Sequence, residues 1–165
     1  MSDIELSLLT FTIGSSKLSD VKEKLGNGII YHEGDAGNSL YVLCYEGPDG
    51  SIVTFESGEM GGTEHVITSG AIFSAKYTYR LKRHCSKLSL VNRNLKLADI
   101  RIGDSTTAVK KVKGVPSKDV KGLLIYSYET QELTTKGQAD IISSVEVSFN
   151  SGKVSSIAVS KIESY

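Results

Sequence analysis

Two short stretches carry apolar residues at helical spacing. In the stretch 18–25, Leu18, Val21 and Leu25 fall at positions i, i+3 and i+7, which places them on one face of a helix. The stretch 107–113 repeats this spacing with fewer apolar residues. We therefore expect two short amphipathic helices, one in each half of the chain.

Both expected helices carry signals at their ends. Serine and aspartate oxygens can accept hydrogen bonds from first-turn amides, and glycine tolerates the left-handed backbone that ends many helices. The start signals are Ser15, Ser16, Asp104 and Ser105, and the end signals are Gly26 and Gly114.

The residues after each helix are typical of strands. Aromatic and β-branched runs, turn residues such as those at 47–50, and strict alternation of apolar and polar residues predict antiparallel hairpins. The expected strands cover 40–45, 51–56, 123–128, 145–149 and 154–160.

The same landmarks occur twice in the same order. Ile13-Gly14 before the first helix returns as Ile102-Gly103, and the segment 53–58 returns as 147–152. We therefore predict an α+β protein of two tandem helix-plus-antiparallel-meander units, with joined sheets and the helices on one face. The units would cover 1–81 and 100–165, with a linker at 82–99.

Charge is balanced over the chain but not along it. The 165 residues hold 19 basic and 19 acidic side chains, yet Arg80 to Lys121 contains 12 basic and 3 acidic ones. This segment (12 − 3 = +9) is either an ordinary solvated surface or a docking patch for an anionic surface. Nucleic-acid binding is not expected, because the pI is about 6.8 and no nucleic-acid motif occurs.

The two cysteines leave two interpretations open. Cys44 lies in an apolar run and could be a buried thiol, whereas a Cys44–Cys85 disulfide requires export to an oxidising compartment. No apolar stretch is long enough to span a membrane, and the first ten residues do not form a signal peptide.

The paired pattern resembles a known superfamily. Ile-Gly-x-Ser, a helix, a glycine, a strand tyrosine, Phe-x-x-Gly and a last apolar strand are similar to the β-lactamase-inhibitory-protein-like proteins and the SmpA/OmlA-type lipoproteins of outer-membrane assembly. The resemblance covers roughly 11–68 and 100–162, and it implies an exported, periplasmic bacterial protein that acts by binding. The chain departs from both groups, because it has one cysteine per half and no lipidated N-terminal cysteine.

No motif indicates catalysis. The histidines, His32, His65 and His84, lack ligand or nucleophile partners at a recognised spacing, and no phosphate-binding or nucleophile-elbow motif occurs. We therefore expect no enzyme activity, no metal and no cofactor.

The expected function is protein binding through an open sheet face, as an envelope adaptor or inhibitor. Tyrosines on two strands either point outward and form the binding surface or point inward and belong to the core. The alternatives are binding of an anionic lipid or envelope surface through the basic segment, and inhibition of a β-lactamase or protease. The candidate residues are Tyr41, Tyr45, Tyr126 and Tyr128 for protein binding, and Arg80, Lys82 and Arg83 for the basic segment.

Overall fold

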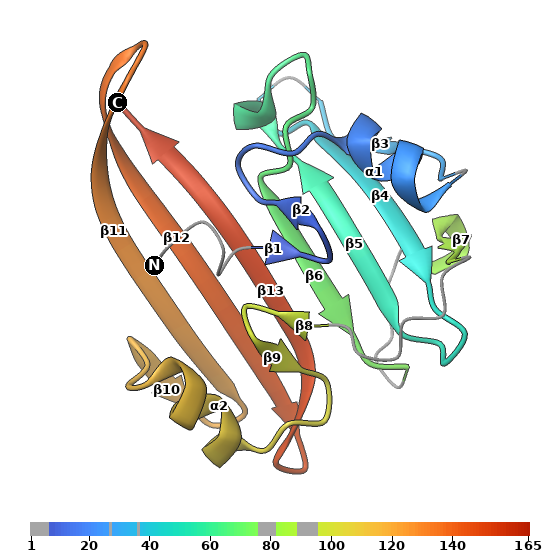
Figure 1. The fold of residues 1–165 in the computed structure, drawn as a ribbon, viewed down its shortest axis with the longest axis vertical. Coiled ribbons are helices and arrows are strands. Elements are labelled where there is room, and N and C mark those ends of the chain that lie inside the picture. The colour runs from blue at the N-terminus through green and yellow to red at the C-terminus, as the bar shows by residue number, and fades with distance from the viewer. Residues whose placement is uncertain (1–6, 27, 36, 76–81, 89–95) are drawn as a thin grey trace.

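The computed structural model describes residues 7–26, 28–35, 37–75, 82–88 and 96–165. Its main element is a nine-stranded sheet in the order β10-β11-β12-β13-β6-β5-β4-β3, with β7 parallel to β4 and all other neighbours antiparallel (Figure 1). The strands are β3 (Tyr31–Glu33), β4 (Leu40–Glu46), β5 (Ile52–Ser57), β6 (Ser69–Phe73), β7 (Ser86–Lys87), β10 (Lys118–Val120), β11 (Leu123–Thr134), β12 (Gly137–Asn150) and β13 (Lys153–Ser164).

One face of this sheet is covered. The helices α1 (Leu18–Leu25) and α2 (Thr106–Lys113) lie over it together with a small four-stranded sheet (Figure 1). Residues of all these layers meet in one hydrophobic cluster, which therefore holds the fold together. The small sheet is β2 (Phe11–Thr12), β1 (Ser7–Leu8), β8 (Lys96–Leu97) and β9 (Ile100–Arg101), and two short 3-10 helices are η2 (Glu59–Gly61) and η3 (Lys82–His84).

The predicted fold class is wrong. Strands dominate the chain, which forms two antiparallel sheets, and it is not a balanced α+β protein built from helix-plus-meander units. The main reason is the length of β11, β12 and β13, which run for 12, 14 and 12 residues, whereas each α-helix has 8. Residues 129–138 around the β11–β12 turn are mostly polar and exposed, so they lack the alternation that marks a strand over a core.

The helix predictions are confirmed in position but not in burial. The first helix spans Leu18–Leu25 as expected, and the second begins one residue early, at Thr106. The first buries all three of its apolar residues. The second buries only Val109, while Val112 is 55% exposed, so the two helices contribute very differently to the core.

The helix ends follow the sequence at three of four places. Gly26 and Gly114 end the helices with φ of +94° and +81°, and Ser105 Oγ accepts from the Ala108 amide at 3.1 Å. The prediction of Ser15 or Ser16 at the start of α1 is wrong, because Lys17 takes that position. The Lys17 amide donates to the Asp20 carboxylate at 2.8 Å, which supplies the same stabilisation from inside the helix.

The opposite face of the main sheet is formed by the residues that alternate with the core residues along each strand. Val145 and Val159 lie in the core, so Ser144 and Ser160 lie on the other face. The register aligns Ser127, Ser144, Ser160 and Ser69 in one row across four neighbouring strands.

We call this side of β11, β12 and β13 the open face. On the same side of the sheet, η3 and Cys85 contact the distant β3–β4 end.

Candidate binding surfaces

Two of the four predicted tyrosines belong to the core. Tyr45 and Tyr126 are each 1% exposed, and their hydroxyls donate to the carbonyls of Gly26 (3.1 Å) and Gly114 (3.2 Å). Each phenol thus reaches from the sheet to the end of the helix above it. Burial raises the pKa of Tyr45 and is also the main cause of the raised pKa of Tyr126. Neither residue is available to a partner, so the outward interpretation is wrong for both.

The other two tyrosines lie on the same, covered face and are half-buried. Tyr41 and Tyr128 pack against the edge of the hydrophobic cluster. The Tyr41 ring stacks on His32 at 4.4 Å between centroids and lies 4.2 Å from the His65 ring. Tyr41 and His65 also line a shallow hollow with Ser39, Gly58, Glu59, Gly62 and Thr63.

The hollow does not have the geometry of a nucleophilic site. His32 Nε2 lies 3.2 Å from Ser39 Oγ, a distance at which a histidine can activate a serine. However, the Ser39 hydroxyl donates to the Asp35 carbonyl at 3.3 Å, so it accepts from His32 instead of giving up its proton. No hydrogen bond from a described residue orients the other ring nitrogen of His32. Among the described residues, no three His, Cys, Asp or Glu side chains are arranged to hold a metal ion.

The basic segment does not form a single surface. Arg80 lies outside the described residues, as does the side chain of Lys82, whose backbone begins η3. Arg83 is exposed, and its Nε donates to His84 at 3.3 Å near the β4 end of the sheet. The lysines of α2 and β10 lie at the far end of the strand order. Two further basic residues, Lys96 and Arg101, lie in the small sheet. The positive charges of the segment are thus spread over separate parts of the fold and do not form one docking patch.

At the α2 end, one lysine is paired. Lys110 Nζ lies 2.8 Å from the Asp119 carboxylate, and this hydrogen bond and charge raise the pKa of Lys110. Four further lysines lie around it in α2, in β10 and in the turn that follows: Lys111, Lys113, Lys118 and Lys121.

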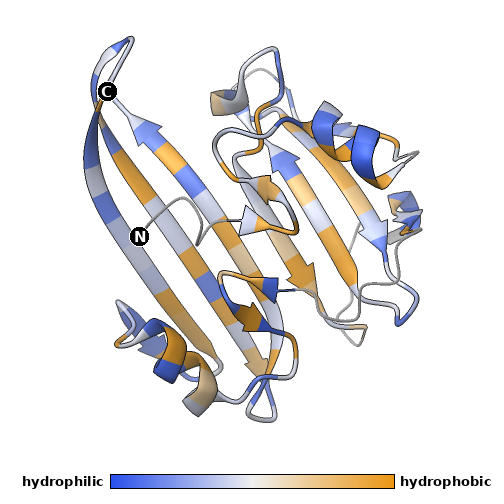
Figure 2. Cartoon of the chain, in the orientation of Figure 1, coloured by the Kyte–Doolittle hydropathy of each residue, from blue (hydrophilic) through white to orange (hydrophobic). Residues whose placement is uncertain are grey.

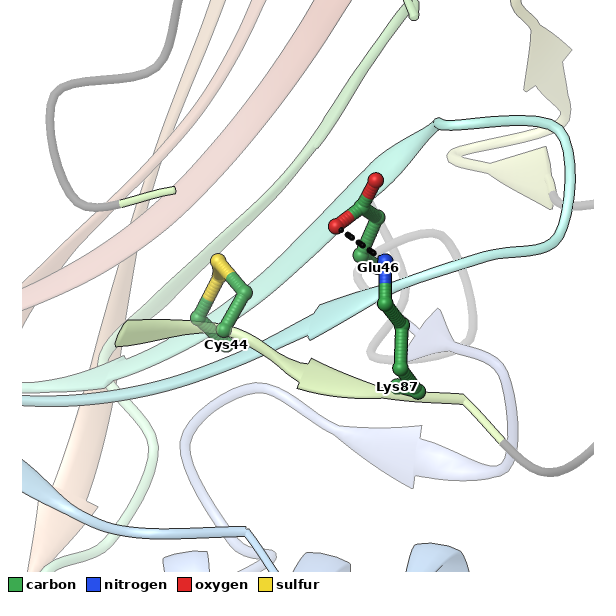
Figure 3. Close-up of a disulfide and its surroundings, with 4 residues drawn as sticks. Cys44, Glu46 and Lys87 are labelled. Atoms are coloured by element: carbon green, nitrogen blue, oxygen red, sulfur yellow. Dashed lines mark hydrogen bonds and ion pairs between the residues drawn. A yellow bond between two sulfur atoms is a disulfide. The ribbon is translucent and has the colours of Figure 1, made fainter. Parts of the chain in front are cut away.

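Cys44 and Cys85 form a disulfide, which is one of the two interpretations that the sequence left open. The bridge joins β4 to the segment 82–88, with the Cα atoms 4.5 Å apart. Beside it, Lys87 pairs with Glu46 at 2.8 Å (Figure 3). The Leu88 amide donates to the Glu46 carbonyl at 2.9 Å. These contacts fasten residues 82–88 to the edge of β4.

Sequence reasoning expected an open sheet face but missed the residues that form it. Ile142 and Ile162 are cross-strand partners there, 38% and 48% exposed. The serine row lies next to them, and Glu129 and Glu146 are exposed on neighbouring positions of the same face. The alternation of valines with serine and glutamate at 143–148 was a signal for this face, but it did not reveal the isoleucine pair.

No described helix is both long and apolar enough to cross a lipid bilayer. Comparison with known proteins gives no assignment, since no family model, no curated protein and no solved structure matches the chain.

Proposed function

We propose that this chain is a non-enzymatic, exported bacterial protein that binds another protein through the open face. The observation that carries the proposal is the exposed Ile142–Ile162 pair beside a row of serines on the side of the sheet opposite α1 and α2. Exposed apolar groups on a sheet face are a common feature of protein interfaces.

The chemistry of the face limits the kind of partner. Serine side chains are short, so a partner can approach closely above Ser144 and Ser160, while the isoleucines offer apolar contact. Glu129 on β11 and Glu146 on β12 add negative charge to the face. A partner with an apolar centre and basic groups around it fits this surface best.

Export is supported by the disulfide. Disulfides persist in the periplasm and outside the cell, whereas cytosolic thiols are usually kept reduced. The Cys44–Cys85 bridge is therefore in keeping with a periplasmic or other extracytoplasmic location. Inhibition of a β-lactamase or protease would be one form of the proposed binding activity.

The test is an affinity capture from envelope extracts at low and high salt, with three baits. The wild-type chain is compared with Ile142→Lys/Ile162→Lys and with Val115→Lys, which changes an apolar residue that is 92% exposed elsewhere. We expect a protein that is retained at high salt by the wild type and by Val115→Lys but lost with the double variant. Equal retention by all three baits would contradict the proposal, as would binding to anionic lipid alone that is lost at high salt.

A further inference from the structure

The outer edge of β11 is paired over only part of its length. β10 pairs with Leu123, Leu124 and Ile125. The Ser117 hydroxyl continues the edge by accepting from the Ser127 amide at 3.0 Å and donating to the Ser127 carbonyl at 3.4 Å. No described segment pairs with β11 beyond this point, although the strand runs on to Thr134 (Figure 1).

The contact at Ser127 shows which backbone groups face outward. In an antiparallel strand, the N–H and C=O of one residue point to the same neighbour, and the next residue points to the other side. Since Ser127 points away from β12, so do Glu129, Gln131 and Leu133. Their amides and carbonyls form a regular row of six hydrogen-bonding groups on the free edge. Such an edge can receive another strand.

From this geometry we propose that β11 pairs antiparallel with β11 of a second copy, with the two-fold axis at Gln131. In this register Glu129 faces Leu133 of the second copy, Gln131 faces its own equivalent, and Leu133 faces Glu129 of the second copy. Each of these three pairs exchanges two hydrogen bonds, so all six outward groups are satisfied. A shift of two residues in either direction leaves part of the row unpaired.

The side chains fit the same register. Glu129 and Glu132 face Leu133 and Thr130 of the second copy, so no two carboxylates stand directly opposite each other. Leu133 is 88% exposed in the single chain and lies on the open face. In the pair, the methylene groups of Glu129 lie between Ile142 and Leu133 of the second copy, because Ile142 is the β12 partner of Glu129. Exposed apolar surface on this row is thereby covered.

The hydropathy of the edge favours a reversible contact. β11 changes from hydrophobic near β10 to mainly hydrophilic toward its turn with β12 (Figure 2). A strand-to-strand contact of this length buries little area, which is typical of weak association. The proposed dimer joins two main sheets edge to edge and places both open faces in one continuous surface. It does not depend on the proposed function, because it follows from the edge alone.

Sedimentation velocity over a concentration series tests the proposal with wild type and Gln131→Pro. Proline removes the central outward amide but no backbone hydrogen bond to β12, so the folded chain tolerates it on a free edge. It also removes the exposed side-chain hydrogen bonds of Gln131 with Asp140 and Gln138. We expect the wild type to dimerise reversibly and Gln131→Pro to raise the dissociation constant by about tenfold or more. Circular dichroism and the melting temperature confirm that the variant is folded. A wild type that stays monomeric at about 1 mM, or a dimer that Gln131→Pro leaves intact, overturns the proposal.

A cross-linking experiment fixes the register and does not depend on the proline variant. Opposed residues of an antiparallel pair have Cα atoms about 5.5 Å apart, within reach of a disulfide. Gln131→Cys should therefore give a covalent dimer under mild oxidation. Gln138→Cys is the matched control, since it lies on β12, away from the edge, and its side chain contacts Gln131. Equal cross-linking of both variants, or none of Gln131→Cys, rejects this register.

Discussion

The two helices make the same contact with the sheet but are held in different ways. The carbonyl of the glycine that ends each helix accepts a tyrosine hydroxyl, from Tyr45 under α1 and from Tyr126 under α2. However, α1 buries three apolar side chains, while α2 buries only Val109. The disulfide lies in the same half of the main sheet as α1 but on the opposite face, and it joins β4 to the segment 82–88. Thus α1 is stabilised mainly by burial, and α2 depends more on its caps and polar contacts.

The largest difference in stability between variants of the two helices should come from removing an apolar side chain. Leu18 is fully buried, so Leu18→Ala should lower the free energy of unfolding by about 2–5 kcal/mol through lost burial and a cavity. Val112→Ala in α2 should change it by less than about 0.5 kcal/mol. Urea denaturation of both variants measures this. Equal losses would contradict the different roles of the two helices.

The disulfide gives the next largest effect. The loop that it closes has a sequence separation of 41, so Cys44→Ala/Cys85→Ala should destabilise the chain by about 2–4 kcal/mol. Thermal melts with and without a dithiol reductant provide the control. The wild type should lose stability on reduction, and the double variant should not respond. A wild type that is insensitive to full reduction would show that the bridge contributes little.

Removal of the tyrosine hydrogen bonds should destabilise the chain less, and the effect should depend on pH. Tyr45→Phe and Tyr126→Phe each remove a hydrogen bond to a helix-ending carbonyl, worth about 1 kcal/mol. Both phenols have pKa values raised above the unfolded value of about 10. Their stabilisation is therefore complete below that pH and is lost as the pH rises through the folded-state pKa.

Denaturation at increasing pH checks this directly. Each Phe variant should lose part of the alkaline decrease in stability that the wild type shows. If the wild type and both variants share the same alkaline slope, the phenols do not titrate as described.

The smallest expected difference concerns the helix starts. Ser105→Ala removes the Oγ that accepts from Ala108 and should cost about 1 kcal/mol. Ser15→Ala should cost less than about 0.5 kcal/mol, because the start of α1 is stabilised by Asp20 instead. Chemical denaturation measures the stability loss of each variant. A larger loss for Ser15→Ala than for Ser105→Ala would contradict the assignment of Asp20 as the residue that stabilises the start of α1.

The sequence predicted local features better than the long strands and the surface. Helix spacing and the glycines located both helices, and the aromatic run located β4. The parts of β11 and β12 next to their shared turn were missed because residues such as Gln131 and Glu132 are exposed on both faces, so burial imposes no alternation on them. The sequence also did not predict the hydrogen bonds of Tyr45 and Tyr126 to the helix-ending glycines. The tyrosines lie 19 and 12 residues after their glycines, so no fixed spacing indicates these bonds.

The open face is the central claim, and footprinting tests it most directly. Hydroxyl-radical labelling of the wild type would be measured with and without the captured partner, followed by mass spectrometry. We expect protection of Ile142 and Ile162, with unchanged labelling of Met60 in η2 and of Val115, which are both exposed. Protection of Met60 or Val115 with full labelling of both isoleucines would contradict binding through the open face.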